Sequence, residues 1–414
     1  DEIFGEENFI AKIIWKKRGG APNDKYIAAN HEYVLLYAKK NNKVKFYYKP
    51  RTEENISRYK NPDNHPKGPW ISDNLMANVK GGRYVKKLYF PIVNPNTGEK
   101  HYPSSNGNWR FSQETINKLL NNNEIYFGKS GKGRPKLKRF LSDIRDGLSY
   151  STIWDNLPYN NAATHEIEGI FGNINIYDTP KPTRLIQEML KLSTASEDLI
   201  LDFFVGSAST SQAVMQQNME DEGDRKWICV QIPETIEEGS EAAKAGYNTI
   251  ADIARERIRR AGEKIKEDYK DQLNKREELL DIGFKSFELK DSNYRQWTEL
   301  TEEDDEEKLK EQMKLFAEKP LADDYNEEEV MYEILVKEGF DLNAEVGQEK
   351  IGNLQVWTAT DQDRRLVVSF ADKLTQEQIE YLNLGENDTF VCFDYALDDE
   401  TKVNITRNLN IKVI

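Results

Sequence analysis

The sequence contains few of the residues that bind metals or form disulfides. Its 414 residues include two cysteines, Cys229 and Cys392, and four histidines. The two cysteines are far apart in the sequence and the histidines form no ligand motif, so we expect no metal site. So few cysteines are typical of a protein that works in a reducing, cytoplasmic setting.

Long hydrophobic runs are also missing. No apolar stretch approaches the roughly 20 residues that a membrane-spanning helix needs. The chain starts with Asp1-Glu-Ile-Phe-Gly, which lacks the charge pattern of a signal peptide. We therefore predict a cytoplasmic protein without a membrane partner.

The charge is strongly uneven along the chain. Residues 1–150 carry 28 Lys and Arg against 15 Asp and Glu, a net charge of +13, whereas residues 151–414 carry 30 against 57. A basic region on a protein of net charge −14 indicates a polyanionic partner. The alternative is a solvated lysine-rich surface with no partner.

The segment Leu199-Ile-Leu-Asp-Phe-Phe-Val-Gly-Ser-Ala-Ser-Thr210 is the clearest candidate for a ligand site. It predicts a buried parallel strand, a tight turn at Gly206 and a helix that Ser207, Ser209 or Thr210 caps. A carboxylate at Asp202 beside a helix N-terminus suits a zwitterionic or anionic cofactor. A strand–turn–helix corner without a ligand is the alternative.

Strands and helices alternate around this segment. We expect helices over residues 180–195, 211–218 and 247–279, the last ended by Gly283, and a second buried strand over residues 227–232. This alternation predicts an α/β protein with a doubly wound parallel sheet.

The basic region has a different character. Residues 9–17 and 31–38 predict strands, while residues 43–150 are irregular and rich in aromatic and basic residues, Trp70, Tyr84, Tyr89 and Trp109 among them. Gly131-Lys-Gly-Arg-Pro-Lys-Leu-Lys-Arg139 contains five cations and no acid. Such a mixture suits phosphate neutralisation and base stacking, although packing of a small domain explains the aromatics nearly as well.

Several segments together resemble the modification subunit of Type III restriction–modification systems, which is an adenine-specific DNA methyltransferase of the permuted class. The segments that carry the resemblance are Trp15-Lys-Lys17, His31 to Lys39, Gly131 to Lys136, Ser151 to Trp154, Asp178 to Ile186, Leu201 to Phe204, Val230 to Glu234 and Gly246 to Ile253.

The resemblance implies a methyltransferase-type doubly wound sheet, S-adenosylmethionine as cofactor and methyl transfer to the exocyclic amine of adenine. Asp202 would then bind the cofactor's amino group, the backbone from Phe203 and Phe204 to Gly206 and Ser207 would cradle its methionine part, and Gln231 would approach its ribose or adenine. Thr179, Lys181 and Thr183 would close the pocket. We expect Lys16, Arg18, Arg110, Arg134, Lys136, Lys138 and Arg139 to contact double-stranded DNA. Implied partners are a second copy of the chain and a helicase–nuclease restriction subunit.

Three features depart from the family pattern. Ala208 replaces a glycine, at a cost of roughly 1–2 kcal/mol if its backbone is left-handed. Gln231 stands where nucleotide folds often have an acid. The catalytic Asp-Pro-Pro-Tyr is missing, and Asn156-Leu-Pro-Tyr159 is a poor substitute, so we predict no catalytic residue here. By the family's order that motif would precede Asp1, and the chain would be a C-terminal fragment.

Five regions follow from these patterns. They are residues 1–42, the end of the catalytic half; 43–150, target recognition; 151–299, the cofactor-binding half; 300–329, an acidic linker or helix; and 330–414, a small α+β module. A non-catalytic DNA-binding and subunit-docking fragment remains an alternative function. A nicotinamide-dependent dehydrogenase is disfavoured because a third glycine after Ala208 and an acid at Gln231 are both missing.

Overall fold

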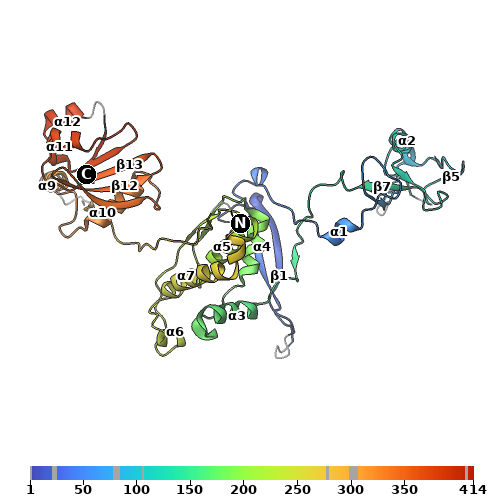
Figure 1. Ribbon diagram of the computed structural model, residues 1–414, viewed down its shortest axis with the longest axis horizontal. Coiled ribbons are helices and arrows are strands. Elements are labelled where there is room, and N and C mark those ends of the chain that lie inside the picture. The colour runs from blue at the N-terminus through green and yellow to red at the C-terminus, as the bar shows by residue number, and fades with distance from the viewer. Residues whose placement is uncertain are drawn as a thin grey trace. The chain divides into compact units, whose positions relative to one another are not determined.

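The computed structural model describes residues 2–20, 26–77, 84–104, 107–276, 279–297, 306–405 and 409–414 (Figure 1). The chain forms two compact units, Asp1–Gly283 and Phe284–Ile414. Both mix helices with small sheets. No helix in the described part of the chain has the length and hydrophobicity required to cross a membrane.

The first sheet has the order β2-β1-β8. Strands β1 (Phe9–Lys16) and β2 (His31–Tyr37) are antiparallel, and β8 (Ile153–Trp154) pairs parallel with β1. Ile13 and Trp15 point to one side of β1, where they pack against Leu185 of helix α4 (Thr183–Ser193). The two strands predicted over residues 9–17 and 31–38 are confirmed.

The second sheet is the parallel pair β9 (Leu199–Asp202) and β10 (Lys226–Cys229). Helices pack against it in the middle of Figure 1, where α4, α5 and α7 are labelled. Apolar residues of α4 and α5, such as Leu190 and Val214, form a core with Ile200. The helices of this part are α3 (Asn160–Phe171), α4, α5 (Ser209–Asp221), α6 (Glu241–Lys244), α7 (Ile250–Asp268) and α8 (Lys270–Leu273), with the 3-10 turn η4 (Ile174–Ile176).

Two predictions for this part need correction. Strand β9 is parallel to its neighbour but is not buried on both sides, because Leu199 is 63% and Leu201 59% exposed. In the described residues the helices cover only one side of this two-stranded sheet, so its other apolar side faces solvent. The helix predicted to end at Gly283 ends at Asp268. Its start is fixed by a capping box between Thr249 and Asp252.

Residues 43–150 form small antiparallel sheets around their own core. Three strands, β3 (Trp70–Asp73), β7 (Lys136–Phe140) and β6 (Ile125–Tyr126), make one sheet, and β4 (Ile92–Val93) pairs with β5 (Lys100–His101). The core consists of Leu75, Phe90, Ile92, Trp109, Ile116, Ile125 and Phe127. The helical elements here are α1 (Glu53–Ser57) and α2 (Gln113–Asn121), with η3 (Lys86–Leu88), while η1 (Glu6–Asn8) and η2 (Asn41–Lys43) flank the first sheet along the chain.

The second unit has a five-stranded sheet in the order β11-β12-β13-β14-β15, antiparallel up to β13 and parallel thereafter. Leu321 and Tyr294 contribute to its core, so the unit includes residues that we had expected in the linker and the cofactor-binding half. Residues 298–305 lie outside the described part. The elements are α9 (Glu306–Glu318), α10 (Glu327–Lys337), β11 (Glu345–Ile351), β12 (Leu354–Asp361), β13 (Arg364–Ser369), α11 (Gln376–Tyr381), β14 (Thr389–Cys392), η5 (Asp394–Ala396), α12 (Asp399–Ile405) and β15 (Asn410–Val413).

Candidate cofactor site and nucleic-acid surface

The turn between β9 and α5 is held by the carboxylate of Asp202, the last residue of the strand. One oxygen accepts the backbone N–H of Phe204 at 3.1 Å, and the other accepts the hydroxyl of Thr210 at 2.5 Å. The carboxylate thus joins the strand end to the first turn of α5. It remains only partly buried, as a group that binds a cofactor amine would have to be.

Two residues of the turn have left-handed backbones, Gly206 with φ +54° and Ala208 with φ +61°. A Cβ at Gly206 would lie 2.6 Å from the Tyr177 hydroxyl, so the Tyr177 side chain would have to move, and the left-handed backbone adds strain for any residue other than glycine. Ala208 therefore has the left-handed backbone that costs an alanine roughly 1–2 kcal/mol. It is also the N-cap of α5, and no side chain caps the helix, which corrects the expected role of Ser207, Ser209 and Thr210.

Gln231 supports the same turn from the segment after β10. Its side-chain oxygen accepts the N–H of Gly206 at 2.8 Å, and its amide nitrogen donates to the carbonyl of Ile232 at 3.0 Å. Both ends of the side chain are therefore used within the protein. The predicted contact with a ribose or an adenine stays a prediction.

The residue that organises the back of the turn is Arg257 of α7, which is fully buried. Its guanidinium donates to the hydroxyls of Ser207 at 2.7 Å and Ser209 at 2.9 Å, and to the side chain of Gln212 at 2.9 Å. The Glu166 carboxylate lies 3.4 Å from it. Burial lowers the pKa of Arg257 to about 10, while Glu166 and Tyr177 oppose that shift.

Our sequence reasoning missed Arg257, although a signal was present. The predicted helix has apolar residues at Ile253, Ile258, Ala261 and Ile265, and Arg257 lies on the same stripe, four residues after Ile253 and four before Ala261. A cation on the apolar side of a helix needs a buried partner.

Glu166 also fixes the start of α4. Its carboxylate accepts the backbone N–H of Thr183 at 3.2 Å and the Thr183 hydroxyl at 3.1 Å. Burial raises the pKa of Glu166, and the Thr183 bonds and Arg257 oppose this shift. Helices α3, α4, α5 and α7 therefore meet at one buried polar cluster behind the turn.

The three residues expected to close the pocket differ in their surroundings. Thr179 is exposed and has a φ of +53°, which is strained for a β-branched residue. Lys181 is paired with Glu32 at 2.7 Å and lies over the Trp15 ring. Thr183 is buried against Glu166, so its side chain acts in the cluster behind the turn.

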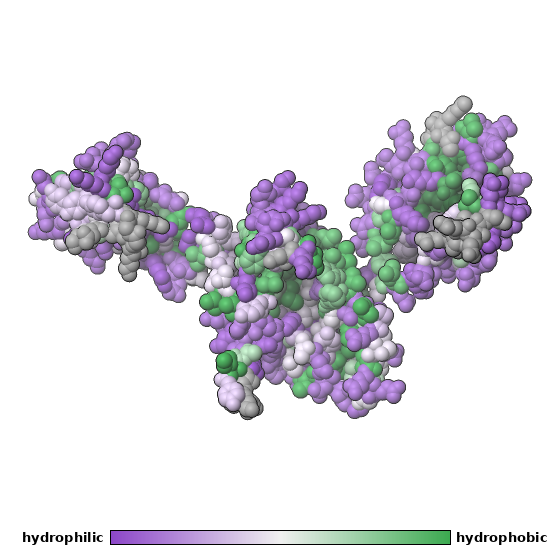
Figure 2. Space-filling model, turned by 180° about the vertical axis from the view of Figure 1, so that it is seen from behind, coloured by the Kyte–Doolittle hydropathy of each residue, from purple (hydrophilic) through white to green (hydrophobic). Residues whose placement is uncertain are grey.

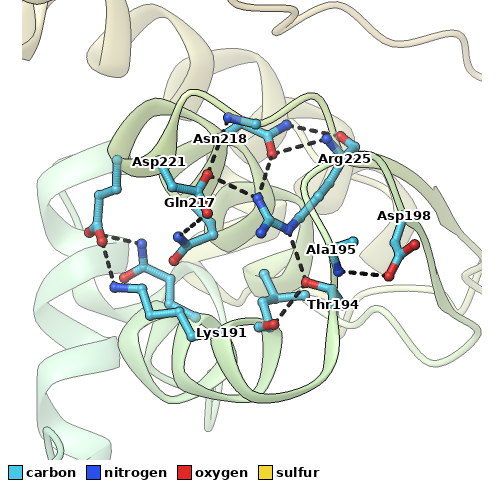
Figure 3. Close-up of polar contacts among 12 residues, drawn as sticks. Lys191, Thr194, Ala195, Asp198, Gln217, Asn218, Asp221 and Arg225 are labelled. Atoms are coloured by element: carbon cyan, nitrogen blue, oxygen red, sulfur yellow. Dashed lines mark hydrogen bonds and ion pairs between the residues drawn. The ribbon is translucent and has the colours of Figure 1, made fainter. Parts of the chain in front are cut away.

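The opposite ends of the two parallel strands are fixed by Arg225 (Figure 3). Its guanidinium donates to Thr194 at 2.9 Å and to Asp221 at 3.0 Å, and its backbone N–H donates to Asn218 at 3.1 Å. Nearby, the Asp198 carboxylate accepts the N–H of Ala195 at 2.8 Å. The bonds of Arg225 tie the end of α4 and the end of α5 to the residue just before β10.

Exposed aromatic rings flank the turn on its outer side. Phe203 and Phe204 lie with their ring centroids 5.0 Å apart, and both are mostly exposed. No group of three or more His, Cys, Asp or Glu residues among the described residues is arranged to hold a metal ion.

The expected DNA-contacting residues divide into exposed and buried groups. Lys136 and Arg139 are exposed on β7, whereas Lys138 is buried beside them and ion-paired with Asp63. Alternation along the strand explains the difference between Lys138 and Arg139, which point to opposite sides of β7, whereas Lys136 shares the side of Lys138 but is exposed at the start of the strand. Lys138 is therefore corrected to a residue that stabilises the fold.

The remaining expected DNA contacts have intramolecular partners. Arg110 is ion-paired with Asp73 at 3.1 Å, and Arg134 donates to the carbonyl of Tyr102 at 2.6 Å. Lys16 lies over the Tyr159 ring at 5.7 Å. Arg18 follows β1, and its backbone N–H donates to Asn30 at 3.4 Å.

The aromatic residues of the basic region divide in the same way. Trp70 and Trp109 are buried, with their indole N–H groups donating to Asp63 and to the carbonyl of Phe90. Their role is therefore packing, the alternative that we kept open. Tyr84 and Tyr89 are exposed. Figure 2 shows that hydrophilic residues, in purple, occupy much of the surface, with hydrophobic green patches between them.

Comparison with known proteins identifies the family. A family model described as DNA methylase, of the N6/N4 type, matches residues 1–245. The chain is 35% identical to the Mod subunit of the Type III restriction-modification enzyme StyLTI from Salmonella typhimurium, over 69% of this chain and 42% of that protein. It is 27% identical to the EcoP15I Mod subunit from Escherichia coli (70% and 47%) and 30% identical to the Type II methyltransferase M.KpnI from Klebsiella pneumoniae (62% and 64%).

The chain spans less than half the length of the two Mod subunits. The matched region includes the first sheet, residues 43–150 and the β9–α5 turn. The resemblance to Type III modification subunits is thereby confirmed, and the chain belongs to the N6/N4 DNA methylase family.

Proposed function

We propose that this chain provides the cofactor-binding and DNA-reading parts of an adenine-specific DNA methyltransferase, the modification subunit of a Type III restriction–modification system. The β9–α5 turn is the observation that carries the proposal. It combines a half-buried carboxylate, a glycine position where a side chain would displace Tyr177, and two left-handed residues. Such strain is typical of a backbone that is shaped for a ligand.

The residues of the turn fit S-adenosylmethionine, which supplies a methyl group on a positively charged sulfur. Asp202 would accept hydrogen bonds from the cofactor's amino group, because its carboxylate is only partly buried. The exposed rings of Phe203 and Phe204 would lie against apolar parts of the cofactor. Arg257 acts from behind, where it holds Ser207 and Ser209 in place.

The DNA would be bound by the basic region. Lys136, the first residue of β7, and Arg139 are exposed cations, and they would neutralise phosphates without a large desolvation cost. Base chemistry on DNA requires that the target adenine leave the duplex, at a cost of a few kcal/mol. The protein's contribution is then to hold the adenine and the cofactor in a reactive orientation.

Methyl transfer also needs groups that bind the adenine amine. The sequence contains no Asp-Pro-Pro-Tyr, so the proposal assigns cofactor binding and DNA reading to these 414 residues and names no catalytic residue. For the fold, we propose that β1, β2, β9 and β10 are parts of one doubly wound sheet. A second copy of the chain and a restriction subunit are the proposed protein partners.

The test is calorimetry with S-adenosylmethionine. We expect Asp202→Asn to abolish binding, while Asp198→Asn, at the other end of the same strand, leaves it unchanged. Duplex DNA binding should persist in both variants. Binding of NAD without binding of S-adenosylmethionine would overturn the assignment in favour of a dehydrogenase.

A further inference from the structure

We propose that Tyr84, Tyr89 and Tyr102 form a stacking surface for unpaired bases of a DNA strand, called here the tyrosine surface. The inference rests on the proposed function. It adds that this face of the basic region binds a DNA strand whose bases are unpaired. Its rings contribute stacking, whereas the exposed cations Lys136 and Arg139 of β7 are assigned to the phosphates of a duplex.

The three rings are adjacent in space and open to solvent. The centroids of Tyr84 and Tyr89 are 6.5 Å apart, and those of Tyr89 and Tyr102 are 5.8 Å apart. Their exposed fractions are 50%, 41% and 44%. Tyrosines that served only packing would be covered, as Trp109 is in the core of the same region.

The backbone under the rings is firmly held. Trp109 donates its backbone N–H to Leu88 at 3.0 Å and its indole N–H to Phe90 at 2.8 Å, on either side of Tyr89. Phe90 is buried in the core. The neighbour of Tyr102, His101, is likewise buried near Phe127. Because alternate residues point inward, Tyr89 and Tyr102 are presented outward on a rigid support.

The surroundings of the tyrosine surface are basic. Residues 84–104 and 129–136 are joined by hydrogen bonds from Asn94 to Gly131 at 2.9 Å and from Arg134 to Tyr102 at 2.6 Å. Together the two segments carry seven cations and one acid, Glu99. In the described part of the chain none of the seven has an ion-pair partner. They are Lys86, Lys87, Lys100, Lys129, Lys132, Arg134 and Lys136.

The ring spacing favours unpaired over paired bases. In a duplex successive bases are about 3.4 Å apart along each strand and cover one another's faces. The tyrosine rings are 5.8 and 6.5 Å apart and tilted by 31° and 52°, so bases stacked on one another as in a duplex cannot cover them together, whereas separated bases can each lie on one ring. Aromatic rings among cations are the common means of binding such strands. Extrusion of a target base breaks one base pair, so unpaired bases are present when adenine is withdrawn.

Fluorescence anisotropy on the full 414-residue chain tests the proposal. The probes are a labelled oligothymidine strand, which has no secondary structure, and a labelled duplex. We expect Tyr89→Ala and Tyr102→Ala each to weaken single-strand binding about tenfold, because stacking contributes roughly that much per base. Tyr89→Phe should bind within twofold of the parent chain, since it keeps the ring.

Tyr381→Ala is the matched control, an exposed tyrosine in the second unit. Unchanged single-strand affinity in both alanine variants, with duplex binding by the parent chain intact, would overturn the tyrosine surface and leave the proposed function standing. Equal losses in Tyr89→Phe and Tyr89→Ala would also overturn it, because the hydroxyl would then be the binding group. A parent chain that binds neither probe would contradict the DNA-reading function itself.

Discussion

The guanidinium of Arg257 donates a hydrogen bond of 2.7 Å to the hydroxyl of Ser207, a residue 50 positions earlier in the chain. The bond is buried, and it connects the middle of α7 to the turn that holds the candidate cofactor site. Glu166 faces the same guanidinium at 3.4 Å. The shape of the turn therefore depends on a charged pair contributed by two helices that do not border it in sequence.

Replacement of Arg257 by alanine should be strongly destabilising. The change leaves the partly buried Glu166 carboxylate without its cation and the hydroxyls of Ser207 and Ser209 without their donor, and loss of one partner of a buried pair lowers the free energy of unfolding by up to about 3–5 kcal/mol. Urea denaturation followed by circular dichroism measures this. Arg259→Ala on the exposed side of the same helix is the control and should have little effect; equal losses in the two variants would refute the role of the buried pair.

Ala208→Gly should be tolerated much better than Ala213→Gly. Both alanines are fully buried and both changes remove one methyl group, but only Ala208 has a left-handed backbone. Relief of the left-handed conformation recovers roughly 1–2 kcal/mol at residue 208, whereas glycine within helix α5 costs about 1 kcal/mol. Denaturant melts of the two variants give the comparison, and indistinguishable midpoints would contradict strain at Ala208.

Leucines on the two sides of the second sheet should respond differently to truncation. Leu190→Ala removes a buried side chain beneath the sheet and should lower the free energy of unfolding by about 2–5 kcal/mol. Leu201→Ala lies on the exposed side and should change it by less than about 0.5 kcal/mol. Thermal or urea unfolding of the two variants measures the difference. A large loss of stability in Leu201→Ala would mean that the exposed side of the sheet is covered in solution.

The three neighbouring cations on β7 should have separate effects. Lys136→Ser and Arg139→Ser should each reduce the slope of log affinity against log salt by about 0.9 for every phosphate that the side chain neutralises. Lys138→Ala should instead lower the free energy of unfolding by about 1.5–3 kcal/mol, because it breaks a charged hydrogen bond to Asp63. Salt titrations of duplex binding and urea melts separate the two outcomes, and an unchanged salt slope would remove β7 from the DNA surface.

Both cysteines should react slowly with alkylating reagents in the folded chain. Burial raises the pKa of the Cys229 thiol to about 11, an effect that the Ser211 hydrogen bond opposes and Asp202 reinforces, and burial raises the pKa of Cys392 to about 12. The thiolate is the reactive form, so its fraction at pH 8 is lower than in a free cysteine and grows only as the pH approaches those values. Mass spectrometry after iodoacetamide treatment, with and without denaturant, measures this; rapid labelling of the folded chain at pH 8 would contradict it.

The local elements were largely predictable from the sequence. Alternating apolar residues predicted β1 and β2 within a residue or two, and the run from Leu199 predicted the strand–turn–helix at Asp202. The family could be inferred because its motifs are short runs of residues that can be recognised without knowledge of the fold. The helix end at Asp268 was missed because the segment after it is as highly charged as the helix itself.

The surroundings of each residue were decided only by the tertiary structure. The sequence by itself determined that Asp202 precedes a glycine turn and that residues 129–139 are basic, because both depend on the order of residues alone. It could not show that Arg257 supports the turn, that Lys138 is buried or that Leu201 is exposed. Those properties depend on which distant segments pack together, and packing decides whether a charge is paired and whether an apolar side chain is covered.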